Sequence, residues 1–183
     1  MPGIIMLKNT IYKWRVRVGY LAALSALVLA IPKLESLFWG FVICLLGLFL
    51  RTWACGHIQK EEKLTVSGPY RYTRNPLYLG NLTIGIGLAA SSFSWFVFGI
   101  FCFYFLAFYP VIIKIEKQKM EKLFPKQYKS FKRVPLFIPS LKPKLPPDKK
   151  KFNWSLFFEN KEYRAWIGVV LFYVTMIIKM IVT

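Results

Sequence analysis

The chain has 183 residues, of which 56% are hydrophobic and 18% aromatic, and its formal net charge is +18 at pH 7. A chain of this length usually forms one domain, and a soluble domain of that size cannot bury so much apolar surface. A nucleic-acid-binding protein can be equally basic, but it lacks uncharged apolar runs of membrane length. The composition therefore predicts an all-α, polytopic membrane bundle with no nucleic-acid partner.

The first apolar run, from Val18 to Pro32, follows several basic residues. This order resembles a signal peptide, but no small-residue cleavage site follows it and further apolar runs do. We therefore predict a retained helix at about 16–32. A second helix is predicted at about 36–58, with Arg51 closing its apolar part.

The longest uncharged segment extends from Asn75 to Ile113. At about 1.5 Å per helical residue its length is roughly 60 Å, enough for two crossings of a hydrocarbon core about 30 Å thick. Polar residues from Ser91 to Ser94 predict a turn between helices at about 76–91 and 94–114. The small residues between Gly80 and Gly87 favour close helix packing.

The chain as a whole is predicted to have a three-part organisation. Residues 1–141 form a membrane core with the first four helices, 142–163 a basic, Pro-rich linker and interfacial segment, and 164–183 a C-terminal transmembrane helix. The aromatic interfacial stretch is either a lid over a site or an anchor before the last span, and we favour the anchor. The expected total is about five transmembrane helices.

Loops rich in basic residues alternate with loops poor in them along the chain. The segment from Lys114 to Arg164 holds 15 of the 26 Lys and Arg residues. The positive-inside rule then places the N-terminus and the basic loops in the cytoplasm. Such a face attracts anionic lipids, at about 1 kcal/mol per basic residue. The lack of a C-terminal retrieval signal and the small size favour a bacterial inner membrane.

Common catalytic and metal-binding motifs are missing from the sequence. Cys44, Cys55 and Cys102 lie in or beside apolar runs without metal-ligand spacing, so they are expected to be core residues, and no metal is predicted. The single histidine, His57, would have to serve any triad or zinc site alone.

The first segment with chemical character extends from Leu64 to Gly80. Its Ser-Gly-Pro-Tyr string predicts a turn, and Asn75-Pro76 predicts an N-cap followed by proline at the first helical position. With Arg74 beside it, that helix N-terminus is a natural site for a carboxylate or phosphate. The alternative is a well-capped membrane helix with interfacial Tyr and Arg.

The second segment extends from Ile115 to Pro139. It begins with an amphipathic stripe that continues the fourth apolar helix, and Glu116 stands where that helix leaves the membrane. Considered alone, a glutamate among basic neighbours is more often a surface ion-pair partner.

Together the two segments resemble the membrane-embedded methyltransferases of the isoprenylcysteine carboxyl methyltransferase and phospholipid N-methyltransferase type. That family has Gly-x-Tyr-x-x-x-Arg-His-Pro-x-Tyr-x-Gly, an apolar hairpin, a Glu-Glu pair, Phe-Gly-x-x-Tyr and a Val-Pro element. The residues that match in order are Gly68, Tyr70, Arg74, Pro76, Tyr78, Gly80, Glu116, Phe124, Tyr128, Val134 and Pro135. Arg51 and the approach from Leu64 to Ser67 also resemble the family, so the similarity covers about 45–140.

Three positions depart from the family pattern: Asn75 replaces histidine, Lys117 replaces the second glutamate, and Pro125 replaces the glycine after Phe124. Asparagine can still donate and accept hydrogen bonds, but it cannot act as a base. A bacterial subgroup with a Thr-Arg-Asn-Pro-Leu-Tyr motif is the closer match, so the departures do not indicate an inactive relative.

The resemblance implies methyl transfer from S-adenosylmethionine, with S-adenosylhomocysteine as product, to a lipophilic acceptor reached from the bilayer. Glu116 would bind the cofactor's ammonium or ribose hydroxyls, and Arg74 with the helix N-terminus would bind its carboxylate. Tyrosines would pack on the adenine or face the sulfonium. The cofactor-binding candidates are Leu64, Val66, Gly68, Tyr70, Arg74, Asn75, Tyr78 and Glu116.

The catalytic candidates are Arg51, His57 and Glu116. Arg51 would orient an anionic acceptor. A carboxylate acceptor needs no general base, whereas an amine or thiol does, and His57 is the one histidine available, although a hydrogen-bonded or interfacial role is favoured for it. The alternative function is a non-catalytic membrane scaffold of the same fold that binds anionic lipid. No obligate protein partner is predicted.

Overall fold

A computed structural model describes residues 2–59, 62–147 and 150–182, which form helices and loops without a strand. The result confirms the predicted all-α membrane bundle. The helices are α1 (Pro2–Leu29), α2 (Leu34–Cys55), the 3-10 helix η1 (Gly68–Arg71), α3 (Pro76–Ser91), α4 (Trp95–Leu123), α5 (Pro125–Phe131), α6 (Trp154–Glu159) and α7 (Tyr163–Val182).

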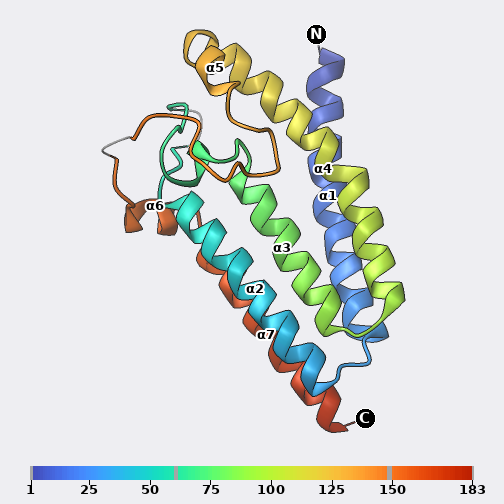
Figure 1. Ribbon diagram of the computed structural model, residues 1–183. Helices are drawn as coiled ribbons and strands as arrows, with labels where there is room; N and C mark the ends of the chain where they lie inside the picture. Colours follow the sequence, from blue (N-terminus) through green and yellow to red (C-terminus); the bar gives the residue numbers. More distant parts are fainter. Residues whose placement is uncertain (1, 60–61, 148–149, 183) are drawn as a thin grey trace.

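The five long helices lie side by side (Figure 1). α3 packs against α2 on one side and α4 on the other, α1 lies beside α4, and α7 lies along α2. The two ends of the chain lie at opposite ends of the bundle (Figure 1). The short elements η1, α5 and α6 all gather near the end at which α3 begins, which we call the cavity end; the end with the α3–α4 turn is the hairpin end.

Three of the described helices are long and apolar enough to cross a membrane: α2, α4 and α7, with mean hydropathies of 1.8, 2.3 and 2.2. α3 has 16 residues, short of the roughly 20 that a bilayer core requires. In α1, Lys13, Arg15 and Arg17 leave an uncharged stretch only from Val18 to Leu29. The number of crossings, about five, and their orientation therefore stay predictions.

Helices occupy each of the five predicted segments, but some of their ends differ from the predicted positions. α1 begins at Pro2 instead of about 16, because its basic N-terminal half is also helical. α4 continues past 114 to Leu123, since its Glu and Lys residues are good helix formers. α2 ends at Cys55, where Gly56 caps it, instead of at about 58.

Glycines bring α2 and α3 together. A Cβ atom on Gly40 would lie 2.5 Å from the carbonyl oxygen of Gly87, and one on Gly47 would lie 2.9 Å from that of Gly80. Small residues at a helix interface let the two backbones approach closely. Membrane helices depend on such packing because lipid tails are as apolar as the side chains, so no hydrophobic force drives the helices together. The close packing expected between Gly80 and Gly87 is present.

The turn between α3 and α4 closes the hairpin end with satisfied polar groups. The Ser91 hydroxyl lies 2.5 Å from that of Tyr173 on α7, and the Ser92 hydroxyl donates to the Ala89 carbonyl at 2.6 Å. The Ile31 amide, from the loop after α1, donates to the Ser92 carbonyl at 2.8 Å. These contacts tie three parts of the chain together at this end.

Candidate active site

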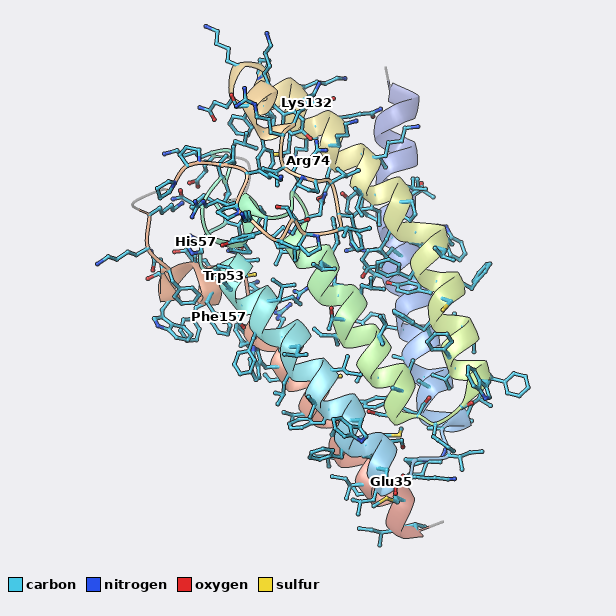
Figure 2. The ribbon with its side chains drawn as sticks, in the orientation of Figure 1. Glu35, Trp53, His57, Arg74, Lys132 and Phe157 are labelled. Carbon is cyan, nitrogen blue, oxygen red and sulfur yellow. The ribbon has the colours of Figure 1, made fainter. Side chains whose placement is uncertain are left out.

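A cavity of about 600 Å³ lies at the cavity end of the bundle. Its wall comes from α1, α2, the loop before α3, α3 itself, α4, α5 and the segment after α5. Figure 2 shows Arg74, which lines this cavity, near the end of the bundle opposite to Glu35. Both sequence segments with chemical character therefore reach a single space.

The loop before α3 is shaped by a glycine and a proline. Gly68 has φ of +55°, and a Cβ atom there would lie 2.5 Å from Cδ2 of His57, so both conformation and space require glycine. Pro69 follows, and Pro69 and Tyr70 are buried in the single turn of η1. This turn places the Tyr70 ring in the cavity wall.

The segment after α5 holds that loop by backbone contacts. The Arg74 amide donates to the Pro135 carbonyl at 2.9 Å, and the Thr73 hydroxyl donates to the Phe137 carbonyl at 2.8 Å. The side-chain amide of Asn75 donates to the Leu136 carbonyl at 2.7 Å. Asn75 does precede α3, with proline at the first helical position, but its side chain does not cap the helix because it is engaged by Leu136.

Glu116 joins the two segments directly. Its carboxylate accepts the Tyr78 hydroxyl at 2.6 Å and the Tyr12 hydroxyl at 3.2 Å. Burial and the Glu116 charge raise the pKa of Tyr12 to about 12, so its phenol stays protonated and donating at neutral pH. α4, α3 and α1 therefore meet at one carboxylate, a more specific environment than that of a surface ion-pair partner.

Three polar atoms in the cavity wall are buried without a hydrogen-bond partner among the described residues. They are Nε of Arg74, the hydroxyl of Tyr70 and the hydroxyl of Thr65. Leaving such a group unsatisfied costs about 1–3 kcal/mol, more where it is charged. Burial raises the pKa of Tyr70 well above its usual range, so this group is a neutral donor. The unmatched atoms point to a polar ligand in the cavity.

Arg74 also contacts the second segment. Its Nη1 donates to the Tyr128 hydroxyl at 3.0 Å, and its guanidinium lies 5.9 Å from the centre of the Tyr128 ring. An arginine from the first segment is thus hydrogen-bonded to a tyrosine from the second, although 54 positions separate them in the sequence.

The side chain of Arg51, on α2, lines the cavity and is held in a fixed orientation by its hydrogen bonds. Its Nε and Nη2 donate to the two carboxylate oxygens of Glu162 at 2.6 and 2.8 Å, and its Nη1 donates to the side-chain oxygen of Asn81. Gly80 on α3 leaves room for the arginine, since a Cβ atom there would collide with its Cγ. Glu162 is 3% exposed.

Most of the predicted site residues line the cavity: Arg51, Leu64, Tyr70, Arg74, Asn75, Tyr78 and Glu116. Val66 and Gly68 do not belong to its wall and instead shape the loop behind it. His57 is also outside the wall: it is 5% exposed, and its Nδ1 lies 3.1 Å from the Ser67 hydroxyl. The structure gives His57 the hydrogen-bonded position favoured above.

Sequence reasoning missed several residues of this site. Asn81 lies one turn after Tyr78 on the same face of α3, a spacing that could have revealed it. Thr65 lies inside the segment already singled out. Tyr12, Arg15 and Glu162 come from distant parts of the chain, and no local pattern connects them to either motif.

The cavity wall is strongly basic. Its cationic residues are Arg15, Arg51, Lys63, Arg74, Lys117 and Lys119, and Glu116 is the acidic residue among them. Among the described residues, the cavity wall included, no three His, Cys, Asp or Glu side chains gather in a group that could hold a metal ion.

The family model described as phospholipid methyltransferase matches residues 35–127, half of the chain. The chain belongs to this family. The matched range runs from the first turn of α2 through α3 and α4, and it includes Arg51, Arg74, Tyr78 and Glu116. Membership confirms the resemblance that the two motifs indicate.

Two curated proteins are similar to this phospholipid methyltransferase family member. The chain is 34% identical over 93 residues to the cobalt-zinc-cadmium resistance protein CzcN of Cupriavidus metallidurans. The aligned residues cover 50% of this chain and 43% of that protein. The chain is 32% identical over 120 residues to the nickel-cobalt-cadmium resistance protein NccN of Alcaligenes xylosoxydans xylosoxydans, covering 64% and 50%. The chain spans half or less of the length of these relatives. No solved structure matches it.

Proposed function

We propose that this protein is an integral membrane methyltransferase that transfers a methyl group from S-adenosylmethionine to a lipophilic acceptor reached from the bilayer. The observation that carries the proposal is the meeting of both family motifs in one cavity. There Glu116 accepts the Tyr78 hydroxyl at 2.6 Å, and Arg74 donates to the Tyr128 hydroxyl at 3.0 Å. Membership of the phospholipid methyltransferase family supports the same reaction class.

The residues present fit this cofactor. The cavity of about 600 Å³ lies within the range of small-molecule sites, roughly 300–1,000 Å³. Nε of Arg74, which has no partner among the described residues, offers a donor to the cofactor's carboxylate, and Glu116 offers an acceptor to its ammonium or ribose hydroxyls. The Tyr70 and Thr65 hydroxyls provide further partners. When bound, the cofactor supplies a methyl group already activated by its sulfonium.

The protein's own residues then act mainly by positioning. The hydroxyls of Tyr78 and Tyr12 fix the orientation of the Glu116 carboxylate, and the Leu136 carbonyl fixes that of Asn75. Apolar side chains of Leu64, Leu77 and Met120 also line the cavity and limit the access of water. Holding two reactants in line can lower a barrier by about 7–11 kcal/mol.

The acceptor is expected to carry an anionic group that Arg51 orients. Arg51 lines the cavity, and the wall is basic overall. A carboxylate acceptor needs no general base. This suits the site, because His57 lies behind the wall, beside Ser67, and is not proposed as a base.

We place the protein in a bacterial inner membrane with its cavity end toward the cytoplasm. α2, α4 and α7 provide apolar lengths that can cross a bilayer, and their exposed hydrophobic side chains suit contact with lipid. The basic segments gather at the cavity end, where Figure 2 shows Arg74 and Lys132, and there they attract anionic headgroups. Orientation in this direction lets a water-soluble cofactor enter from the cytoplasm.

A second function is favoured by two residues. The side-chain amide of Asn75, where the family has histidine, donates to the Leu136 carbonyl, and Lys117 brings a positive charge to the cavity where the family has glutamate. A non-catalytic scaffold that binds anionic lipid with the same fold would explain both. The two functions differ in whether the protein binds the cofactor.

Calorimetry on the purified full chain in detergent tests the proposal. The chain should bind S-adenosylhomocysteine, and Glu116→Gln should weaken binding about 10- to 100-fold, because a hydrogen bond to a charged group contributes about 1.5–3 kcal/mol. Glu121→Gln is the matched control, since Glu121 pairs with Lys132 at 3.0 Å on the surface of the same region.

Transfer is then measured with labelled S-adenosylmethionine and total membrane lipid. A labelled lipophilic product supports the proposal, and label confined to soluble peptides contradicts the lipophilic acceptor. Lipid binding without any cofactor binding would establish the scaffold instead.

A further inference from the structure

The last part of the chain contributes a buried charge that contacts Arg51 in the cavity wall. The family match ends at residue 127, yet Glu162, in the turn between α6 and α7, reaches Arg51 on α2. The family pattern assigns no role to this glutamate. It is 3% exposed, whereas Glu159, three residues earlier, is exposed.

The geometry of Glu162 is fixed from several directions. Its backbone amide donates to the Phe157 carbonyl at 3.1 Å, which closes the turn after α6. Its carboxylate accepts Nε and Nη2 of Arg51 at 2.6 and 2.8 Å, a bidentate arrangement, and the Cys55 thiol at 3.1 Å. A planar carboxylate held this way fixes the plane of the guanidinium.

Arg51 lines the cavity, and its contacts with the described residues leave part of its hydrogen-bonding capacity unused. A guanidinium has five N–H donors. Glu162 takes one on Nε and one on Nη2, and Asn81 takes one on Nη1. Within the described part of the chain, one donor therefore remains on each terminal nitrogen of Arg51, a residue that lines the cavity. Two such donors match two oxygens of a carboxylate or phosphate.

A buried ion pair adds little to the free energy of unfolding. Removing two charges from water offsets most of their attraction, and apolar residues of similar volume often serve as well or better. The pair does have a directional effect, since it determines which guanidinium edge is free. Its position at the wall of the proposed active site therefore favours a role in orientation.

We propose that Glu162 is a positioning residue: the C-terminal segment supplies the carboxylate that orients Arg51, so that its two remaining donors bind the anionic group of the methyl acceptor. The acceptor's group is a carboxylate or a phosphate. The inference rests on the proposed methyltransferase function and extends the active site beyond the segment that the family match covers.

The test compares variants of the full chain in lipid nanodiscs. Glu162→Gln keeps the shape of the side chain but removes its charge, and Glu159→Gln is the matched control in the same segment. Binding of dodecanoate, dodecyl phosphate and neutral dodecanol is measured by calorimetry, together with S-adenosylhomocysteine binding and thermal unfolding. The acceptor KM and kcat are measured with total membrane lipid.

Wild-type protein should bind one of the two anionic probes and not dodecanol, and the preferred probe identifies the anion. Glu162→Gln should weaken that binding and raise the acceptor KM by up to about 100-fold, the effect of a small misplacement, while S-adenosylhomocysteine binding is kept. Glu159→Gln should match the wild type. Equal probe binding by Glu162→Gln and wild type would overturn the inference.

Two double variants separate orientation from folding. The pair Arg51→Met with Glu162→Met removes both charges and should keep the fold, because no unpaired charge is buried, yet lose anionic-probe binding. The swapped pair Arg51→Glu with Glu162→Arg should recover thermal stability but not acceptor kinetics. If either double variant shows wild-type acceptor kinetics, Glu162 is purely structural. Wild-type protein that binds no S-adenosylhomocysteine would instead refute the proposed function.

Discussion

The two ends of the α2–α3 pair differ in how their helices pack and in whether their buried polar groups have partners. At the hairpin end, Gly40 and Gly87 bring the backbones into contact, and the hydroxyls of Ser91 and Tyr173 satisfy each other at 2.5 Å. At the cavity end, the side chain of Arg51 on α2 lies against Gly80 of α3 and lines the cavity. Buried polar atoms there have no partner within the described chain.

The contrast shows where stability and function are located. Close packing with satisfied polar groups gives a rigid frame. Unsatisfied buried groups lower stability, and they persist only where the surrounding structure holds them for a purpose such as ligand binding. The hairpin end therefore supports the geometry, and the cavity end provides the chemistry.

Enlarging a glycine at the hairpin end should have the largest effect on stability. Gly87→Ala would place a Cβ atom 2.6 Å from the Sγ of Cys44 and from the carbonyl oxygen of Gly40. Overpacking of this kind costs about 1–3 kcal/mol, so the melting temperature in detergent should fall. Gly99→Ala on α4 is the control, because its new Cβ atom meets nothing within 4 Å. Equal melting temperatures for the two variants would show that the α2–α3 contact is not tight.

Removing one phenol hydroxyl should have opposite effects at the two ends. Tyr173→Phe leaves the Ser91 hydroxyl without its partner and should destabilise the protein by about 1 kcal/mol or more. Tyr70→Phe removes a buried hydroxyl that no described residue bonds, and it should stabilise the ligand-free protein by up to about 1 kcal/mol while weakening S-adenosylhomocysteine binding. Thermal unfolding and calorimetry measure the two effects. A Tyr70→Phe variant that is both less stable and unchanged in binding would contradict this comparison.

The smallest expected effect is a dependence of stability on alkaline pH. The pKa of Tyr12 is raised to about 12 from an ordinary value near 10. The unfolded chain therefore loses this proton first, and stability that is fully present below about pH 10 is lost as the pH rises toward 12. Tyr12→Phe should remove part of this slope in unfolding curves measured across that range. An unchanged slope would show that Tyr12 does not face Glu116.

Much of the site could be predicted from the sequence, because motif residues lie close together along the chain. Two segments of the sequence indicate Arg74, Tyr78 and Glu116, and these three residues do line one cavity. His57 is a candidate because it is the one histidine in the sequence, and composition alone cannot show which face of a loop a ring occupies. The turn at Gly68 places that ring beside Ser67 and behind the wall.

The sequence by itself determined the helical segments and the membrane character, since apolar runs, turn residues and good helix formers act through neighbours a few residues apart. Only the tertiary structure decided how those helices share polar groups. Glu162 and Arg51 are 111 residues apart in the chain, and Tyr12 and Glu116 are 104 apart. Contacts of that separation form when packing brings whole helices together, and a one-dimensional pattern carries no record of which faces meet.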